Sequence, residues 1–159
     1  MRDLIYKFFS NPNFGSSVVE NERALQLEMA IMFRNQGYEV KFEAAQNVLP
    51  HPSSTKRQKS NLDLLVRGND EPIAIELKVP LAGRVPETMY DFCADVSFIE
   101  AIVASGAVAK GYSIMMTNDK SYWTGSIQTG IYAPFRQLSY SLGGRIEKPT
   151  GTAKTELFL

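Results

Sequence analysis

The stretch that decides the fold spans residues 61–78 and reads NLDLLVRGNDEPIAIELK. Two runs rich in Leu, Val and Ile flank the polar residues GNDE, which have the composition of a four-residue turn. Pro72 suits the first position of a returning strand, because its missing N–H is tolerated there. The pattern therefore predicts a β-hairpin in which Arg67 lies opposite Pro72.

In this register, one face of the hairpin is entirely aliphatic. The apolar pairs are Leu62 with Leu77, Leu64 with Ile75, and Val66 with Ile73. The other face places Asp63 opposite Glu76 and Asn61 opposite Lys78. A slip of one residue would move the aliphatic side chains to the other face, which favours this register.

Asp63 and Glu76 would then stand about 5 Å apart at Cβ, where two carboxylates repel each other. A divalent cation removes that repulsion, and hard oxygen ligands suit Mg²⁺ or Mn²⁺. Lys78 lies two residues beyond Glu76 and projects from the same face, where its ammonium could hold an attacking water or stabilise a phosphate. The alternative is a solvated polar face on an edge hairpin. The aliphatic back face, the opposed acids and the lysine together favour a metal site.

A helix is predicted upstream, in SSVVENERALQLEMAIMFRNQGYEV (residues 16–40). Ser17 and Glu20 have the spacing of a capping box, and Gly37 ends the helical pattern. Glu28 shares the apolar face of this helix, so its carboxylate needs a partner. The apolar members of that face are Leu25, Met29 and Met32. Glu22 lies earlier, where it suits the positive end of the helix dipole, and a rim salt bridge is the alternative for Glu28.

The segment between this helix and the hairpin divides into a strand and a loop. YEVKFE (residues 38–43) alternates as a strand does, whereas HPSSTKRQKS (residues 51–60) is polar and basic without an apolar anchor. Lys56, Arg57 and Lys59 would lie near the mouth of the site, where they could neutralise phosphates. A plain solvated loop is equally consistent with the composition.

After the hairpin, PETMYDFCADVSFIEAIVASG (residues 86–106) predicts a helix, and GYSIMMTN (residues 111–118) predicts a buried strand. The apolar positions of the helix are Phe92, Val96, Ile99 and Val103. A strand, a helix and a strand in this order indicate a parallel crossover. Asp91 and Asp95 of the helix are interpreted as surface charges, and the alternative is that one of them contacts the metal through water.

Asp63, the hairpin and the Glu76-Leu77-Lys78 triplet, set between these helices, resemble the core of the PD-(D/E)XK nuclease superfamily. Leu62 stands where the family's name has Pro. The resemblance covers about residues 17–118 and implies a restriction-endonuclease-like αβββαβ core with a mixed sheet, α/β in class. It also implies Mg²⁺- or Mn²⁺-dependent hydrolysis of phosphodiester bonds, in DNA more than in RNA. Asp63 and Glu76 would hold the metal with help from Glu28, and Lys78 would complete the catalytic set.

The 159 residues suit one domain, in which residues 119–159 form a C-terminal extension. No signal peptide or membrane-length apolar run is present, and the lone Cys93 favours a reducing cytoplasm. A formal net charge of zero weighs against a protein that coats nucleic acid. The alternatives to a nuclease are an inactive module of the same fold that binds nucleic acid or protein, and a small structural domain. A homodimer is also compatible with the sequence.

Overall fold

The computed structural model describes residues 1–11, 19–48, 58–68, 71–80, 83–137, 139, 143–149 and 156–158. The main elements are α1 (Arg2–Phe9), α2 (Glu22–Asn35), β1 (Glu39–Val48), β2 (Gln58–Arg67), β3 (Ile73–Lys78), α3 (Val85–Ala104) and β4 (Lys110–Met115). The C-terminal part adds η1 (Lys120–Tyr122), η2 (Gly130–Tyr132), α4 (Ala133–Arg136), β5 (Arg145–Glu147) and β6 (Glu156–Phe158). The predicted order of helix, three strands, helix and strand is present from α2 to β4.

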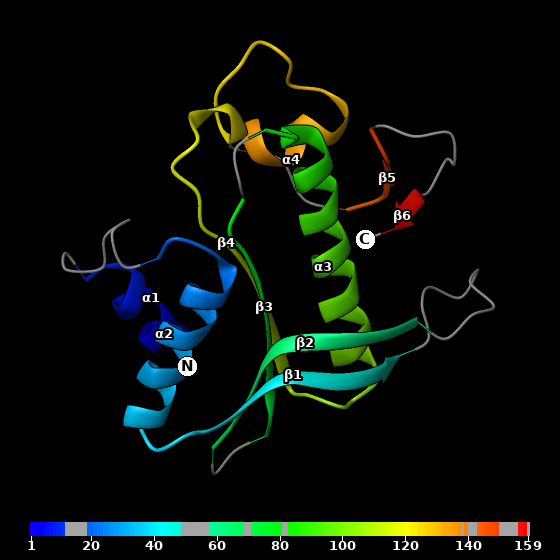
Figure 1. The fold of residues 1–159 in the computed structure, drawn as a ribbon. Coiled ribbons are helices and arrows are strands. Elements are labelled where there is room, and N and C mark those ends of the chain that lie inside the picture. The colour runs from blue at the N-terminus through cyan, green and yellow to red at the C-terminus, as the bar shows by residue number, and fades with distance from the viewer. Residues whose placement is uncertain are drawn as a thin grey trace.

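The central sheet has four strands in the order β1-β2-β3-β4. The pairs β1–β2 and β2–β3 are antiparallel, whereas β3 and β4 are parallel and joined through α3. Helices α1 and α2 lie on one side of this sheet and α3 on the other, with β5 and β6 beside α3 (Figure 1). The predicted α/β class and mixed sheet are therefore confirmed. None of the helices in the described residues is long and apolar enough to cross a membrane.

The register of the hairpin is the predicted one. The β2–β3 ladder pairs Leu64 with Ile75, Leu65 with Ala74, and Val66 with Ile73. The ladder ends there, before it reaches Asp63 and Glu76. Across the other edge of β2, Glu43 comes opposite Asp63 without pairing, and its backbone adopts the left-handed region at φ 46°. Both neighbours of β2 thus depart from regular pairing at Asp63.

This irregularity divides the apolar residues of β2 between two faces. Leu64 and Val66 pack with Ile75 and Leu77 under α1 and α2, as predicted. Leu62 instead packs under α3, so the prediction that it shares a face with Leu64 is wrong. Residues two apart share a face only in a regular strand, and the strand changes side at Asp63. The α3 core contains Leu62, Leu65, Ala74, Ile99, Ile102 and Val108.

Helix α2 begins later than the sequence predicts. Its N-cap is Asn21, whose side chain accepts a hydrogen bond of 3.0 Å from the Ala24 amide. The predicted capping box of Ser17 and Glu20 is therefore wrong, and Ser17 lies outside the described residues. Asn21, which is closer to the first helical residue than Ser17, satisfies a free amide of the first turn in the way that a serine cap would. Gly37, at φ 83°, ends the helix region as predicted. The predicted loop is also shorter, because residues 58–60 belong to β2.

Helix α3 lies close against β4 because Gly111 has no side chain. A Cβ atom at Gly111 would overlap Ile99 of α3. Ile99 is buried as predicted, whereas Phe92, Val96 and Val103 are only partly buried. The buried residues of α3 are Met89, Tyr90, Cys93, Ile99 and Ile102. The first three of these form a third core with Tyr122, Ile131 and Ile146, which attaches the C-terminal part to α3.

Candidate functional site

The structure brings Asp63 and Glu76 together at the point where β2 and β3 stop pairing. Asp63 Oδ2 accepts a hydrogen bond of 2.7 Å from the Leu77 amide, and the two carboxyl groups lie within hydrogen-bonding reach of each other. Glu76 is only 8% exposed. Its Oε1 atom is buried without a hydrogen-bond partner. A buried, unpartnered carboxylate oxygen is costly and needs an explanation, such as a bound ion.

Burial raises the pKa of Glu76 to about 9, and repulsion from Asp63 and Asp95 adds to the effect. Burial also raises the pKa of Asp63, against the opposing influence of the Leu77 amide. Two close carboxyl groups titrate as a pair, so the pair holds a proton near neutral pH. A cation between the carboxyl groups would replace that proton.

Lys78 lies beside this pair, as predicted, but it already has two acidic partners. Its Nζ atom is 3.4 Å from Asp95 Oδ2 of α3 and 3.7 Å from Glu22 Oε2 of α2. Burial alone would lower the pKa of Lys78. The attraction of Asp95, Glu22 and Asp63 outweighs burial, and the pKa is raised. Lys78 is therefore a charged ammonium at neutral pH.

The sequence did not identify Glu22 and Asp95 as partners of Lys78. Glu22 was interpreted as a helix-dipole residue, yet its Oε2 also accepts a 3.4 Å hydrogen bond from the Val79 amide. Asp95 was interpreted mainly as a surface charge, which is wrong, because its side chain is only 23% exposed and its Oδ2 lies 3.4 Å from Lys78 Nζ. Burial also raises the pKa of Asp95 to about 6. The position of Asp95 on its helix could have shown that it faces the core. Asp95 precedes Ile99 and Ile102 by four and seven residues, and thus shares their buried face.

The role of Glu28 as a metal ligand stays a prediction. Within the described residues, no hydrogen bond or ion pair joins it to Asp63 or Glu76. The residue of α2 that faces this part of the sheet is Gln26, whose Nε2 donates to the Asp63 carbonyl at 2.7 Å and to Glu43 Oε1 at 3.4 Å. At about 100° per residue, Glu28 is turned about 200° from Gln26.

The predicted nucleic-acid contacts fall mostly outside the described residues. Lys56 and Arg57 lie in the undescribed segment, and Lys59 has a described backbone in β2 but no described side chain. Their role in binding stays a prediction.

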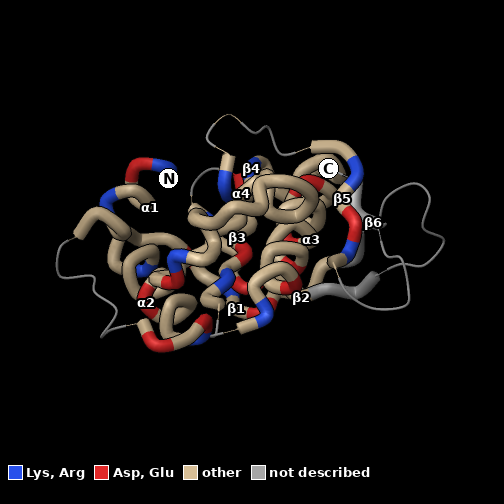
Figure 2. The backbone as a smooth tube through the Cα atoms, turned by 90° about the horizontal axis from the view of Figure 1, so that it is seen from above, with Lys and Arg blue, Asp and Glu red and all other residues tan. Residues whose placement is uncertain are grey.

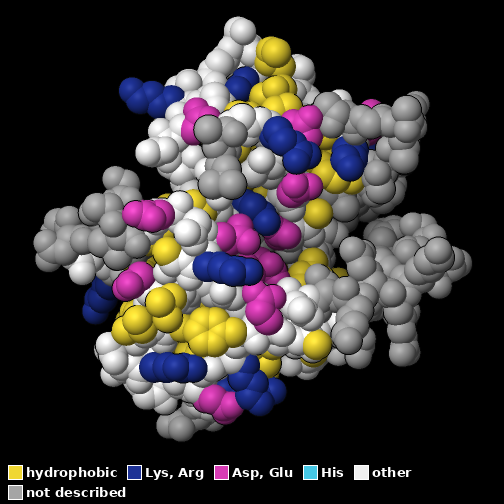
Figure 3. Space-filling model, viewed as in Figure 1, with side chains coloured by type: hydrophobic (Ala, Val, Ile, Leu, Met, Phe, Trp, Pro, Cys, Tyr) yellow, Lys and Arg dark blue, Asp and Glu magenta, His cyan; other side chains and the backbone are white. Residues whose placement is uncertain are grey.

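Acidic side chains gather around basic ones on the face that this site occupies. Seen from above, β3 lies between α2 and α3 (Figure 2). In the space-filling view, Asp and Glu side chains surround Lys or Arg side chains at the middle of the molecule, over the same region (Figure 3). The ionisable residues that interact there are Glu22, Glu43, Asp63, Glu76, Lys78 and Asp95.

The donor set suits one mode of metal binding. Within the described residues, no three or more His, Cys, Asp or Glu side chains are arranged to hold a metal ion. An all-protein cage is therefore absent from this part of the chain. Mg²⁺ commonly binds through one or two carboxylates and completes its coordination with water and substrate phosphate. The Asp63–Glu76 pair, with its unpartnered Oε1 atom, fits that mode.

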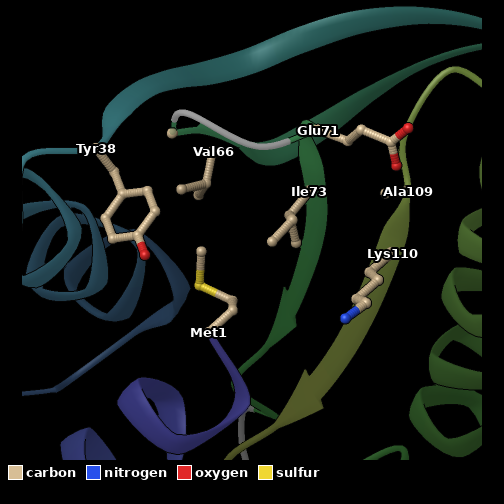
Figure 4. Close-up of a pocket in the computed structure, with 8 residues that line it drawn as sticks. Met1, Tyr38, Val66, Glu71, Ile73, Ala109 and Lys110 are labelled. Atoms are coloured by element: carbon tan, nitrogen blue, oxygen red, sulfur yellow. The ribbon is translucent and has the colours of Figure 1, made fainter.

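A cavity of about 720 Å³ lies at the other end of β3. Its lining residues are Met1, Tyr38, Val66, Gly68, Glu71, Ile73, Ala109 and Lys110 (Figure 4). Ile73 lines this cavity and lies three residues before Glu76 on β3, so about 10 Å of strand separates the cavity from the acidic pair. Among the described lining residues, apolar side chains accompany one acid, Glu71, and one base, Lys110, so no pair of carboxylates is found there.

Comparisons with protein-family models, curated proteins and solved structures find no match to this chain. A function must therefore be argued from the geometry of the site.

Proposed function

We propose that this chain is a metal-dependent nuclease of the PD-(D/E)XK type, with a restriction-endonuclease-like core, that hydrolyses phosphodiester bonds. The observation that carries the proposal is the pairing of half-buried Asp63 with buried Glu76, which has an unpartnered oxygen, and Lys78 lies two residues away. DNA is the expected polymer because of the resemblance in the sequence.

Asp63 and Glu76 would hold Mg²⁺ or Mn²⁺. The chemistry that such an ion supplies is Lewis-acid stabilisation of phosphate charge and a lowered pKa of an attacking water. The Leu77 amide fixes one carboxylate oxygen of Asp63, which would help to hold this side chain beside Glu76. Glu76 would give up its proton when the ion binds, because the neighbouring charge then favours the carboxylate.

Lys78 would place a positive charge beside the phosphate as negative charge develops in the transition state. Its side chain is about 25% exposed, so substrate can reach the ammonium from solvent. Phosphate oxygens would then share Lys78 with its present partners, Asp95 and Glu22.

A second function is favoured by a different observation. No set of three metal-ligating side chains is formed in the described residues, and Lys78 is already ion-paired. A module of the same architecture that binds nucleic acid or a protein without cutting would have these properties. The two functions differ in their need for a divalent ion.

The test is a cleavage assay on plasmid, single-stranded DNA and RNA with Mg²⁺ or Mn²⁺. Wild-type protein should cleave, and Lys78→Ala should cleave about 100-fold or more slowly, as expected for loss of one positioned electrostatic group. Lys78→Arg should not restore the rate fully, because a planar guanidinium cannot place its charge at the same point. Lys110→Ala, which removes an exposed lysine of β4, is the matched control. Identical behaviour of wild type and Lys78→Ala, including no cleavage by either, would leave only the binding function.

A further inference from the structure

Lys78 ends β3 at the place where the two helical layers approach each other. Glu22 reaches it from α2, which covers one face of the sheet, and Asp95 reaches it from α3, which covers the other. The ammonium is therefore held from both sides by carboxylates that belong to neither strand of the hairpin. The arrangement is a brace formed by Glu22, Lys78 and Asp95.

The two arms of this brace differ in what else they contact. Glu22 Oε2 also accepts the Val79 amide, so its position is tied to the end of β3. Asp95 Oδ2 is buried, and its described ion pair is with Lys78. Burying a carboxylate is costly unless a charge offsets it, and Lys78 is the cation that does so here. The buried Asp95 carboxylate therefore depends on Lys78 as its partner.

Both distances, 3.4 and 3.7 Å, exceed the 2.7–2.9 Å typical of a tight charge-assisted hydrogen bond. The brace therefore holds the ammonium by charge without locking it in one geometry. Without the brace, the flexible four-carbon stem would let Lys78 turn toward the nearby Asp63–Glu76 pair. An ammonium paired with those acids would occupy the place intended for a divalent ion.

We infer that Asp95 is a positioning residue, which with Glu22 keeps the Lys78 ammonium beside the Asp63–Glu76 pair and out of it. The catalytic consequence rests on the proposed nuclease function, whereas the positioning itself does not. Asp95 is not assigned a contact with substrate or metal, and it acts only through Lys78.

The first experiment measures the positioning without any nuclease assay. A small amine-acylating reagent is applied at fixed pH, and the labelling of Lys78 is measured by mass spectrometry relative to the exposed Lys120. Asp95→Asn keeps the size of the side chain and removes its charge. It should lower the labelling of Lys78 relative to Lys120, because the released ammonium turns toward the Asp63–Glu76 pair and away from the reagent. Asp95→Glu should restore most of the labelling.

Asp91→Asn is the matched control, because Asp91 is exposed and lies one turn earlier on the same helix. Circular dichroism and thermal unfolding verify that each variant folds. Equal labelling of Lys78 in Asp95→Asn, Asp91→Asn and wild type would overturn the inference. A folded Asp95→Glu variant that labels like Asp95→Asn would also count against it, because a restored charge should restore the brace.

The second experiment is a double-mutant cycle on cleavage with Mn²⁺. Asp95→Asn should lower kcat by about tenfold with little change in KM, since the charge that stabilises the transition state is displaced. In the Lys78→Ala background the same substitution should have no further effect, because Asp95 acts only through Lys78. Additive losses would show an independent role for Asp95. Absence of cleavage by wild type would reject the nuclease function and leave the labelling result to decide the positioning.

Discussion

Asp63 accepts a hydrogen bond from the main-chain amide of Leu77, the residue that lies between Glu76 and Lys78. This single contact, at 2.7 Å, joins the acid of one strand to the triplet of the other at the point where their ladder ends. The position of Asp63 therefore depends on the backbone of β3. Changes at Asp63 should alter the charge of the site more than its shape.

Glu76→Gln should change how stability depends on pH. The folded pKa of Glu76 is raised from 4.5 to about 9, so the folded wild type holds this proton more tightly than the unfolded chain. That contribution to stability is fully present below pH 4.5 and is lost as the pH rises to about 9. Glutamine stays neutral, so the variant should be more stable than the wild type by several kcal/mol at pH 8 and similar to it near pH 4. Urea unfolding at a series of pH values measures this, and parallel curves for both proteins would contradict it.

Asp63→Asn should abolish a response to divalent ions. Mn²⁺ or Mg²⁺ should raise the Tm of the wild type, because an ion that binds the folded state stabilises it by mass action. The variant should start at least as stable, since asparagine can still accept the Leu77 amide. Calorimetry at pH 7 in two buffers of different ionisation enthalpy should show release of about one proton per ion by the wild type. Equal affinity of both proteins for Mn²⁺ would exclude the site.

Glu22→Ala and Glu28→Ala should differ, although both remove an acid from α2. Loss of Glu22 removes the acceptor for the Val79 amide and one partner of Lys78, and should cost about 1 kcal/mol of unfolding free energy. Loss of Glu28 should change stability by less than about 0.5 kcal/mol and leave metal affinity unchanged. Chemical denaturation and Mn²⁺ titration of the two variants provide the comparison. A larger effect at Glu28 would restore it as the helix carboxylate of the site.

The combined replacement of Lys56, Arg57 and Lys59 by Ala should weaken binding of DNA and flatten its salt dependence. Each phosphate contact releases about one counterion, so each lost contact should reduce the slope of log affinity against log salt concentration by about one. The cleavage rate at saturating substrate should change little, because these residues are not assigned to the chemistry. Fluorescence anisotropy between about 50 and 200 mM salt measures the slope. An unchanged slope would show that the basic segment does not contact the substrate.

The parts of the fold that followed from sequence are those with a strong repeating pattern. Alternation and the turn composition predicted the β2–β3 register, and helical spacing predicted α2 and α3. The apolar run at residues 111–118 and the order of strand, helix and strand predicted the parallel strand β4. The packing of Leu62 under α3 could not be predicted. It results from a change of side in β2 at Asp63, opposite Glu43, whose backbone lies in the left-handed region. Backbone irregularities of this kind leave no periodic trace in the sequence.

The sequence predicted which strand residues come together, but not which helix residues join them. Asp63, Glu76 and Lys78 come together because two-residue spacing and hairpin register fix them. Glu28 was chosen from α2 by its place among apolar neighbours, yet the orientation of a helix about its own axis is set by packing. Here Gln26 and Glu22 are on the side that faces the end of β3. The same spacing argument, applied to α3 with Ile99 and Ile102 as references, would have identified Asp95.

The missing side chain of Gly111 has a consequence at a distance. It lets Ile99 rest directly on β4, and Ile99 is one helical turn beyond Asp95 on the same face of α3. A methyl group at position 111 would therefore lift the helix and carry Asp95 away from Lys78. Such a variant would keep every ionisable group, and yet it should affect Lys78 in the same way as Asp95→Asn. The distance between Asp95 and Lys78 therefore depends on Gly111, a residue that has neither charge nor side chain.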